Sequence, residues 1–403
     1  MDILMLAHRI PYPPNKGDKI RSFHLLRALA ERFRVHLATF IDDPHDERFV
    51  PELSRWCASH CVRPLSPRAS RIRALRGFLS GEPLSVAAYR DAEIGRWIDA
   101  TIQRERIQAV VVFSSAMAQY VADPRRAARS VVDFVDIDSD KWRQYSQTAR
   151  WPMSFVYSRE ARLLQDFEAT VARRSRLSVV VSPAERELLA GFDGVDGSRC
   201  VAARNGVDSD YWDAQMPQPT PFPSDERPIV FTGAMDYWAN VDAVCWYATE
   251  VHPIVLQSQP SARFYVVGSN PTPAVRALAA RGAVVTGRVE DVRPFLAHAQ
   301  AVVAPLRLAR GVQNKVLEAM AMGRRVVATS AAVRGITAAP PGVHVADDPA
   351  GFAAATLLAL EDDGGARGTA ARAYVRSEFD WQRNLAPLLA AVQESAEPQT
   401  RGG

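Results

Sequence analysis

The side chains best suited to chemistry lie close together late in the chain, between two short apolar runs. These runs, 301–304 and 325–329, are typical of parallel strands that are covered on both faces. The polar residues between them are two cations, a glycine, two amides and a carboxylate: Arg310, Gly311, Gln313, Asn314, Lys315 and Glu318. This set can bind an anion and hydrogen-bond a sugar hydroxyl, so it is the principal candidate site.

The same stretch predicts a helix that begins at Gly311 and ends near Gly323, because glycine commonly follows a helix C-terminus. Leu317 and Met320 lie on the side of this helix that can pack against a core. At about 100° per residue, the other face presents Gly311, Asn314, Lys315 and Glu318.

Free amides at a helix N-terminus, together with Arg310 and Lys315, form a phosphate-binding arrangement. Glu318 lies further along the helix and can accept hydrogen bonds from a ribose. The alternative is a solvated helix face on which a Lys315–Glu318 pair contributes roughly 0.2–0.5 kcal/mol.

Two glycine-containing loops also follow predicted strands. After the first strand, the proline-rich loop 9–18 places Gly17 just before a helix. After a later strand, Gly233 allows a backbone to approach a ligand closely. Neither loop contains Gly-x-Gly-x-x-Gly, so a dinucleotide fingerprint is absent. The alternative for both loops is turn chemistry with a structural role alone.

Four aspartates crowd the end of another predicted strand: Asp133, Asp136, Asp138 and Asp140. The pattern Asp136-x-Asp138 is typical of a metal site, but a calcium loop would need glycine at Lys141 and glutamate at Gln147. The remaining alternatives are a general base and a polar role in helix capping or substrate positioning.

Length and composition limit the number of domains and the classes of protein to which the chain can belong. A chain of 403 residues suggests two domains, and a net charge of only +4 gives no reason to expect a nucleic-acid partner. Four cysteines without a histidine cluster complete no zinc site and favour a reduced, cytoplasmic location. No apolar run reaches the ~18 residues that a membrane span needs.

Two features of the basic residues stand out. The chain has only four lysines, and each is expected in a loop or helix start near the candidate site: Lys16, Lys19, Lys141 and Lys315. The stretch 63–79 interleaves arginines with apolar residues. It is expected either to contact an anionic membrane peripherally, at the inner face, or to form a solvated helix.

Strand and helix signals alternate along both halves of the chain, which predicts an α/β protein with two doubly wound parallel sheets. A proline-rich segment, 216–228, is the expected linker between a first domain, 1–215, and a second domain, 229–380. Two such sheets would face each other across a cleft, with ligands at the carboxyl ends of the strands. A last helix is expected from Trp381 to about Glu394.

Taken together, these motifs resemble the retaining glycosyltransferases of family four, which have the GT-B fold. The resemblance covers nearly the whole chain. Within the family, the chain most resembles the sugar transferase associated with exosortase (PEP-CTERM) exopolysaccharide loci. It is carried by residues 11–21, 133–142, 204–208, 231–233 and 310–323.

The resemblance implies transfer of a sugar from a nucleotide diphosphate-sugar to a lipid-linked or saccharide acceptor, with retention. No metal or other cofactor is implied. The first domain would bind the acceptor, the second would bind the donor, and a crossover helix, 381–396, would pack back on the first domain.

The resemblance also assigns residue roles. Glu318 matches the family glutamate that holds the ribose, whereas Arg310 stands where the family has another glutamate. The family's usual arginine and lysine are missing near Met235 and Asn240, so we expect Arg310 and Lys315 to supply the charge for the diphosphate.

By the same resemblance, Gln313 and Asn314 would reach the transferred sugar, and Gly17 and Gly233 would line the donor site. Asp136 falls near the position of the family's catalytic histidine. The alternatives are a sugar-nucleotide epimerase of the same fold and a non-catalytic partner in polysaccharide assembly.

Overall fold

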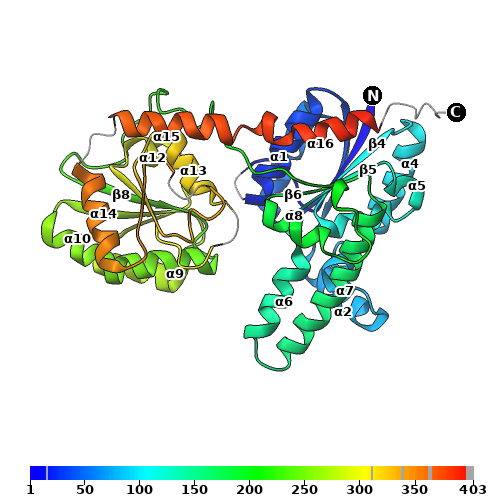
Figure 1. The fold of residues 1–403 in the computed structure, drawn as a ribbon, viewed down its shortest axis with the longest axis horizontal. Helices are drawn as coiled ribbons and strands as arrows, with labels where there is room; N and C mark the ends of the chain where they lie inside the picture. Colours follow the sequence, from blue (N-terminus) through cyan, green and yellow to red (C-terminus); the bar gives the residue numbers. More distant parts are fainter. Residues whose placement is uncertain (15–16, 310–311, 337–339, 362–364, 396–403) are drawn as a thin grey trace. The chain divides into compact units, whose positions relative to one another are not determined.

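The protein forms two compact units, each built on one parallel sheet (Figure 1). The computed structural model describes residues 1–14, 17–309, 312–336, 340–361 and 365–395. Unit 1 comprises Met1–Asn205 together with the segment from Gln382, and unit 2 comprises Gly206–Trp381. Within the described residues, no helix is long and apolar enough to cross a bilayer.

Unit 1 has a seven-stranded sheet in the order β3-β2-β1-β4-β5-β6-β7, and every neighbouring pair is parallel. The central strands are apolar on both faces because helices cover both sides. The strands are β1 Asp2–Ala7, β2 Arg34–Ile41, β3 Cys57–Pro64, β4 Ala109–Phe113, β5 Ser130–Val135, β6 Leu177–Val180 and β7 Cys200–Ala202.

The helices of unit 1 include a long pair, α6 and α7, which Figure 1 shows projecting from the sheet of this unit. They are α1 Gly17–Ala30, α2 Pro67–Ser80, α3 Leu84–Ala88, α4 Ala92–Arg104, α5 Pro124–Ala127, α6 Asp138–Thr148, α7 Met153–Arg174, α8 Pro183–Ala190 and α16 Trp381–Glu394, with the 3-10 helices η1 Pro44–Arg55, η2 Ser115–Val121 and η3 Gly197–Arg199.

Unit 2 has a six-stranded parallel sheet in the order β10-β9-β8-β11-β12-β13. Its strands are β8 Arg227–Thr232, β9 Ala262–Val267, β10 Val284–Gly287, β11 Ala301–Ala304, β12 Val326–Ala328 and β13 Val343–Val345. Its helices are α9 Trp238–Trp246, α10 His252–Ser258, α11 Pro273–Arg276, α12 Arg293–His298, α13 Asn314–Ala321, α14 Pro349–Glu361 and α15 Gly365–Glu378, with η4 Tyr247–Val251 and η5 Ala277–Arg281.

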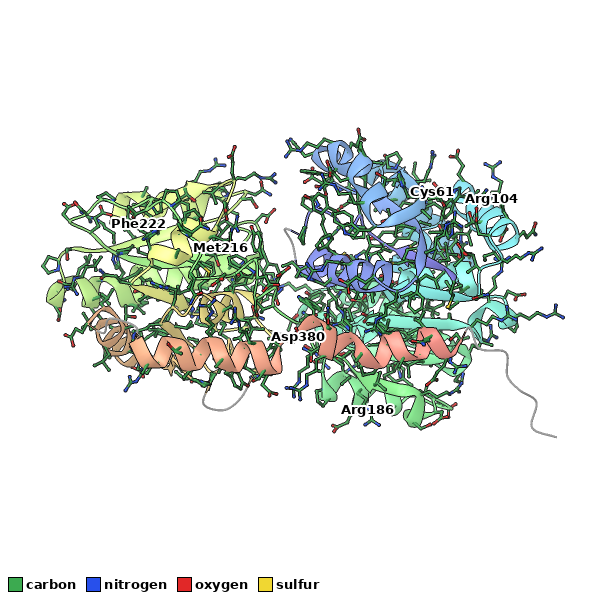
Figure 2. All side chains as sticks on the ribbon, turned by 90° about the horizontal axis from the view of Figure 1, so that it is seen from above. Cys61, Arg104, Arg186, Met216, Phe222 and Asp380 are labelled. Carbon is green, nitrogen blue, oxygen red and sulfur yellow. The ribbon has the colours of Figure 1, made fainter. Side chains whose placement is uncertain are left out.

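The division of the chain differs from the expected one, because the units separate at Asn205 and Gly206 rather than at 215. The proline-rich segment 216–228 belongs to unit 2, and Figure 2 shows Met216 and Phe222 among the side chains of that unit. Phe222 is only 9% exposed and packs edge-on against Tyr265, with 4.6 Å between the ring centroids. A buried aromatic ring therefore holds in unit 2 a segment whose prolines indicated a linker.

The last helix, α16, belongs to unit 1 from Gln382 onward. Four of its apolar side chains are fully or almost fully buried: Leu385, Leu388, Leu389 and Val392. Asn384 donates a hydrogen bond from Nδ2 to the Asn205 carbonyl oxygen (3.2 Å), and Arg176 pairs with Glu394 at 2.9 Å. Helix α16 thus completes the packing of unit 1, whose other elements come from the first half of the sequence.

Candidate functional site

Unit 2 has a topological switch point at the centre of its sheet. Strands β8 and β11 are neighbours, but the chain continues from β8 toward β9 and β10 and from β11 toward β12 and β13 on the other side. In parallel α/β sheets, ligands bind at the carboxyl ends of the strands where the order reverses in this way. Gly233 follows β8 and Lys315 lies in the first turn of the helix after β11, so both predicted residues are at this point.

The ammonium group of Lys315 is held by two partners. Its Nζ donates a hydrogen bond to Oδ1 of Asn240 at 2.6 Å. It also lies 4.1 Å from the ring centroid of Phe231, within the range of a cation–π contact. Asn240 is fixed in turn, because its Nδ2 donates to the Ala234 carbonyl oxygen at 2.9 Å. The lysine is thus oriented by residues of the β8–α9 region.

Gly233 is required by the closeness of this packing. A Cβ atom at this position would lie 2.7 Å from Nδ2 of Asn240 and 3.1 Å from Nζ of Lys315. Gly268, which follows β9, is tighter still, since a Cβ there would lie 1.7 Å from the Gly233 carbonyl oxygen. The absence of side chains at these two positions lets the loops after β8 and β9 meet beside the lysine.

The pKa values of Lys315 and Glu318 are both shifted to about 7, which favours the uncharged form of each side chain. Burial lowers the pKa of Lys315 to about 7, although the nearby carboxylate of Glu318 opposes this shift. Burial likewise raises the pKa of Glu318 to about 7, against the effect of the lysine. The neutral amine of a desolvated lysine beside a helix N-terminus can take up a proton when an anion binds.

The other predicted residues of this helix fall at its start. Helix α13 begins at Asn314, three residues after the predicted Gly311, and Gln313 occupies the N-cap position. Oδ1 of Asn314 is buried without a hydrogen-bond partner among the described residues. Arg310 and Gly311 lie outside the residues that the structure describes. At the other end, Gly323 adopts a φ of 65°, as the predicted C-terminal glycine should.

Unit 1 contains the two remaining predicted residues. It has its own switch point between β1 and β4, since the strands that follow them lie on opposite sides. Gly17 begins α1, which follows the loop after β1, and a Cβ atom there would meet nothing within 4 Å. Asp136 is exposed and follows β5 directly, after Val135 with its positive φ of 68°. Gly17 and Asp136 therefore belong to a different unit from the other candidates.

The loop after β1 carries a charged cluster that the sequence did not indicate. Arg9 forms ion pairs with Asp18 and, at 2.8 Å, with Asp42, while the His8 ring stacks on Phe113 at 5.7 Å between centroids. Although burial opposes ionisation, His8 and Arg9 hold the pKa of Asp18 well below its usual range. This cluster fixes the loop at the carboxyl edge of the unit 1 sheet.

The four aspartates near β5 do not converge on one point. Asp133 is fully buried and binds Arg21, with Oδ2 2.8 Å from Nε and Oδ1 3.1 Å from Nη2. Asp138 pairs with Lys141 and Asp140 pairs with Arg143, each one turn along α6. In the metal-like pattern of Asp136-x-Asp138, the second carboxylate is thus paired with an ammonium group, whereas Asp136 is exposed and precedes α6.

The lysines are also more dispersed than expected. Lys19 is fully buried and pairs with Asp46 at 2.9 Å, so it is structural, and Lys141 pairs with Asp138 on α6. Lys16 lies outside the described residues. Only Lys315 is found among the described candidates of unit 2.

In the described part of the chain, one group of side chains has the ligand atoms of a metal site within reach of one another: Asp2, His36 and Glu105. Arg34 already bridges the two carboxylates of this group, at 2.8 Å from Asp2 and 3.1 Å from Glu105. A guanidinium therefore provides the positive charge there.

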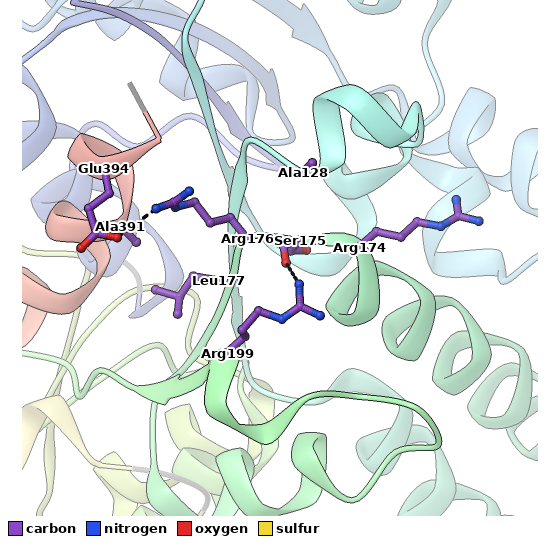
Figure 3. A pocket seen from close by; sticks show the side chains of 8 residues that line it. All are labelled: Ala128, Arg174, Ser175, Arg176, Leu177, Arg199, Ala391 and Glu394. Carbon is purple, nitrogen blue, oxygen red and sulfur yellow. Dashed lines mark hydrogen bonds and ion pairs between the residues drawn. The ribbon is translucent and has the colours of Figure 1, made fainter. Parts of the chain in front are cut away.

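A pocket of about 400 Å³ lies in unit 1, away from all the predicted residues. Figure 3 shows Arg176 reaching Glu394 and Arg199 reaching the Ser175 carbonyl oxygen at its edge. Most of its lining residues lie just before or at the first residues of β5, β6 and β7, and the others lie on α16, so the pocket is at the amino ends of these strands. Ligands of such sheets bind at the opposite ends.

Sequence reasoning missed the residues that hold Lys315. Asn240 lies inside α9 and was considered only as a position where the family's usual cation is missing, and Phe231 belongs to β8. Tyr211 and Arg293 were also missed; the guanidinium lies 4.1 Å from the ring centroid. Burial raises the pKa of Tyr211, with further contributions from charged groups that include Glu318. On the β8 side of this neighbourhood, the sequence signal was Gly233.

Comparison with known proteins gives a family for part of the chain. Residues 226–362 match the family described as Glycosyl transferases group 1, which covers most of unit 2. No curated protein is similar enough in sequence to count as a match.

Solved structures resemble the whole chain. Sucrose-phosphate synthase from Thermosynechococcus elongatus is 17% identical with a TM-score of 0.69, covering 98% of each chain. Anabaena HepE in complex with UDP-glucose is 15% identical with a TM-score of 0.65, covering 98% of this chain and 100% of the other. WaaG, a glycosyltransferase involved in lipopolysaccharide biosynthesis, is 14% identical with a TM-score of 0.63, covering 99% and 100%. The two parallel sheets thus have the GT-B fold.

Proposed function

Because residues 226–362 are those of a group 1 glycosyltransferase domain, we propose that this protein is a retaining glycosyltransferase. It moves a sugar from a nucleotide diphosphate-sugar to a lipid-linked or saccharide acceptor. We further propose a role in exopolysaccharide biosynthesis, which the resemblance of residues 11–21 and 133–142 to the exosortase-associated transferases supports.

The observation that carries this proposal is the position of Lys315, in the first turn of α13 at the switch point of unit 2. Departure of a nucleotide diphosphate leaves about two negative charges, which fixed cations and helix amides stabilise in a site of low dielectric. Glu318, one turn further along α13, is suited to accept hydrogen bonds from the ribose hydroxyls. Charge neutralisation by protein groups would make a metal ion unnecessary.

We assign the remaining roles by the same chemistry. Gln313 and Asn314 contact the transferred sugar, and the unpartnered Oδ1 of Asn314 supports this role. Gly233 lets the donor approach the backbone, and Arg310 with Gly311 contributes to the diphosphate. In unit 1, Gly17 contributes to donor binding, as the resemblance implies, and Asp136 acts as the catalytic carboxylate on the acceptor side.

The acceptor is proposed to reach the protein at the cytoplasmic face of the membrane. The arginines and apolar residues of 63–79 support peripheral contact there, and WaaG shows that a protein of this fold can take part in lipopolysaccharide biosynthesis.

The test is to incubate the purified protein with a panel of nucleotide sugars and follow release of the nucleoside diphosphate. UDP-glucose belongs in the panel because HepE was solved with it. We expect release that increases when a lipid-extract acceptor is added. Conversion of the sugar without its consumption would instead identify an epimerase, and no turnover at all would identify a non-catalytic assembly partner.

A further inference from the structure

Exposed apolar side chains concentrate on one part of unit 1. Of the sixteen large apolar residues that are exposed in the described chain, seven lie in two stretches of 19 residues each, 63–81 and 141–159. These seven define what we call the docking face: Ile72, Leu75, Leu79, Tyr145, Trp151, Met153 and Phe155. An exposed apolar surface of this density marks an interaction site.

The two stretches are joined in the fold. On α7, Arg159 donates to the carbonyl oxygens of Gly77 (3.3 Å) and Phe78 (2.8 Å) at the end of α2. The guanidinium of Arg159 also stacks over the Phe78 ring, 4.4 Å from its centroid. Figure 1 shows α2 beside α7, where the α6–α7 hairpin leaves the sheet of unit 1. The two parts of the docking face are therefore linked through Arg159.

Each part of the docking face has the geometry of an insertion element. On α2, residues 72, 75 and 79 repeat at helical spacing, so they form one apolar stripe. At the hairpin tip, Trp151 is 83% exposed, almost the same as Leu79 on α2 at 82%. The hairpin is braced beneath the tip by Trp142 and Tyr157, whose ring centroids are 5.2 Å apart. The exposed Trp151 thus projects from a hairpin whose two helices are packed against each other through these rings.

The charge of the two stretches identifies the partner. They contain eight arginines and one lysine, and neither stretch contains an aspartate, a glutamate or a histidine. Lys141 and Arg143 are paired with Asp138 and Asp140 just before the second stretch, and Arg63 is paired with Glu93. Arg71 and Arg150 are exposed and form no ion pair among the described residues. A second copy of this chain would present the same positive charge and be repelled, so the complementary surface is apolar and anionic.

We propose that the docking face binds the surface of an anionic phospholipid bilayer, with Trp151 and Leu79 inserted at the level of the headgroups. The amphipathic tryptophan ring and the apolar leucine side chain bury in that region, and basic residues beside them pair with lipid phosphates. A protein bound to the bilayer in this way would use a lipid-linked acceptor. The assignment of this acceptor rests on the proposed glycosyltransferase function, whereas the proposal of bilayer binding does not.

The experiment is co-sedimentation of the full chain with vesicles of phosphatidylglycerol or of phosphatidylcholine. We expect binding to the anionic vesicles that weakens as salt is raised, because exposed charges are screened. Trp151→Ser and Leu79→Ser should each reduce that binding by about tenfold or more, and Arg71→Gln with Arg150→Gln should weaken its salt dependence. Leu358→Ser is the matched control, since Leu358 is 57% exposed on α14 of unit 2, and it should leave binding unchanged.

UDP affinity and the melting temperature, measured on the same preparations, separate this inference from the proposed function. Intact UDP binding without any preference for anionic vesicles would overturn the docking proposal alone. Self-association of the wild type that Trp151→Ser and Leu79→Ser abolish, without vesicle binding, would overturn it in favour of a second copy. Vesicle binding without affinity for any nucleotide would leave the docking face standing and contradict the transferase.

Discussion

At the scale of single residues, Lys315 combines a cation with a site that disfavours charge. Burial lowers its pKa to about 7, and the groups that hold its Nζ, Asn240 and the Phe231 ring, are both neutral. Its Nζ is thus held by neutral groups, although the nearby carboxylate of Glu318 still favours the charged form. The lysine is therefore suited to bind an anionic ligand reversibly.

Removal of this lysine should weaken nucleotide binding selectively. Hydrogen bonds to charged groups contribute roughly 1.5–3 kcal/mol, so Lys315→Ala should lower UDP affinity by one to two orders of magnitude in calorimetry. Arg281→Ala is the matched control, because Arg281 is exposed just before β10, at the amino ends of the same sheet. Equal affinities for Lys315→Ala and the wild type would contradict the assigned role.

Nucleotide affinity should also depend on pH. Above about 7, Lys315 in the free protein is largely neutral and has to take up a proton to pair with a diphosphate. Affinity should therefore fall as pH rises from about 7 to 9, at most about tenfold per pH unit, with proton uptake visible in buffers of different ionisation enthalpy. In Lys315→Met this slope should disappear. A slope that persists unchanged would assign the titration to another group, such as Glu318.

At the scale of elements, glycines allow two loops of unit 2 to meet next to the lysine. Gly233→Ala should lower UDP affinity as strongly as loss of Lys315, since the new methyl group would meet the Lys315 ammonium and the Asn240 amide. Gly95→Ala on α4 is the control, because nothing lies within 4 Å of its Cβ position, and alanine there should stabilise the helix by about 0.5–1 kcal/mol. Normal UDP affinity in Gly233→Ala would show that the loop relaxes without disturbing the site.

A buried ion pair fastens α1 of unit 1 to β5. Arg21 binds Asp133 through two nitrogens and also donates to the Ala203 carbonyl oxygen at 2.8 Å. Arg21→Met would leave a buried carboxylate without its cation, so unfolding by denaturant should show a loss of about 3–5 kcal/mol. The double variant Arg21→Met, Asp133→Leu should recover much of it. A single variant as stable as the wild type would mean that water compensates the carboxylate.

Most strands were predictable because they are short apolar runs buried on both faces, as in β1, β4 and β11. The edge strands β3 and β7 were not, because β3 is only half-buried and carries polar residues, and β7 has three residues. Gly233 and Lys315 were predicted as site residues because each comes shortly after a predicted strand in the sequence. Their link through Asn240 joins residues 75 positions apart, and no local pattern encodes such a contact.

At the scale of the whole molecule, unit 2 is one continuous segment, whereas unit 1 needs α16 from the other end of the chain. Leu388→Ala should therefore destabilise unit 1 by about 2–5 kcal/mol, the usual range for a buried leucine. Hydrogen exchange should show reduced protection in β1, β4 and β5, while β8 and β11 keep theirs. Loss of protection in β8 and β11 to the same degree would mean that the two units unfold together.

The late position of α16 has a consequence for synthesis on the ribosome. Domains usually fold as they emerge, the N-terminal one first. Here the polypeptide that will become unit 1 leaves the exit tunnel early, yet the leucines that close its core are translated only after all of unit 2. The apolar core of unit 1 therefore stays incomplete while unit 2 is being synthesised, and during this interval unit 1 has the greatest need of chaperones.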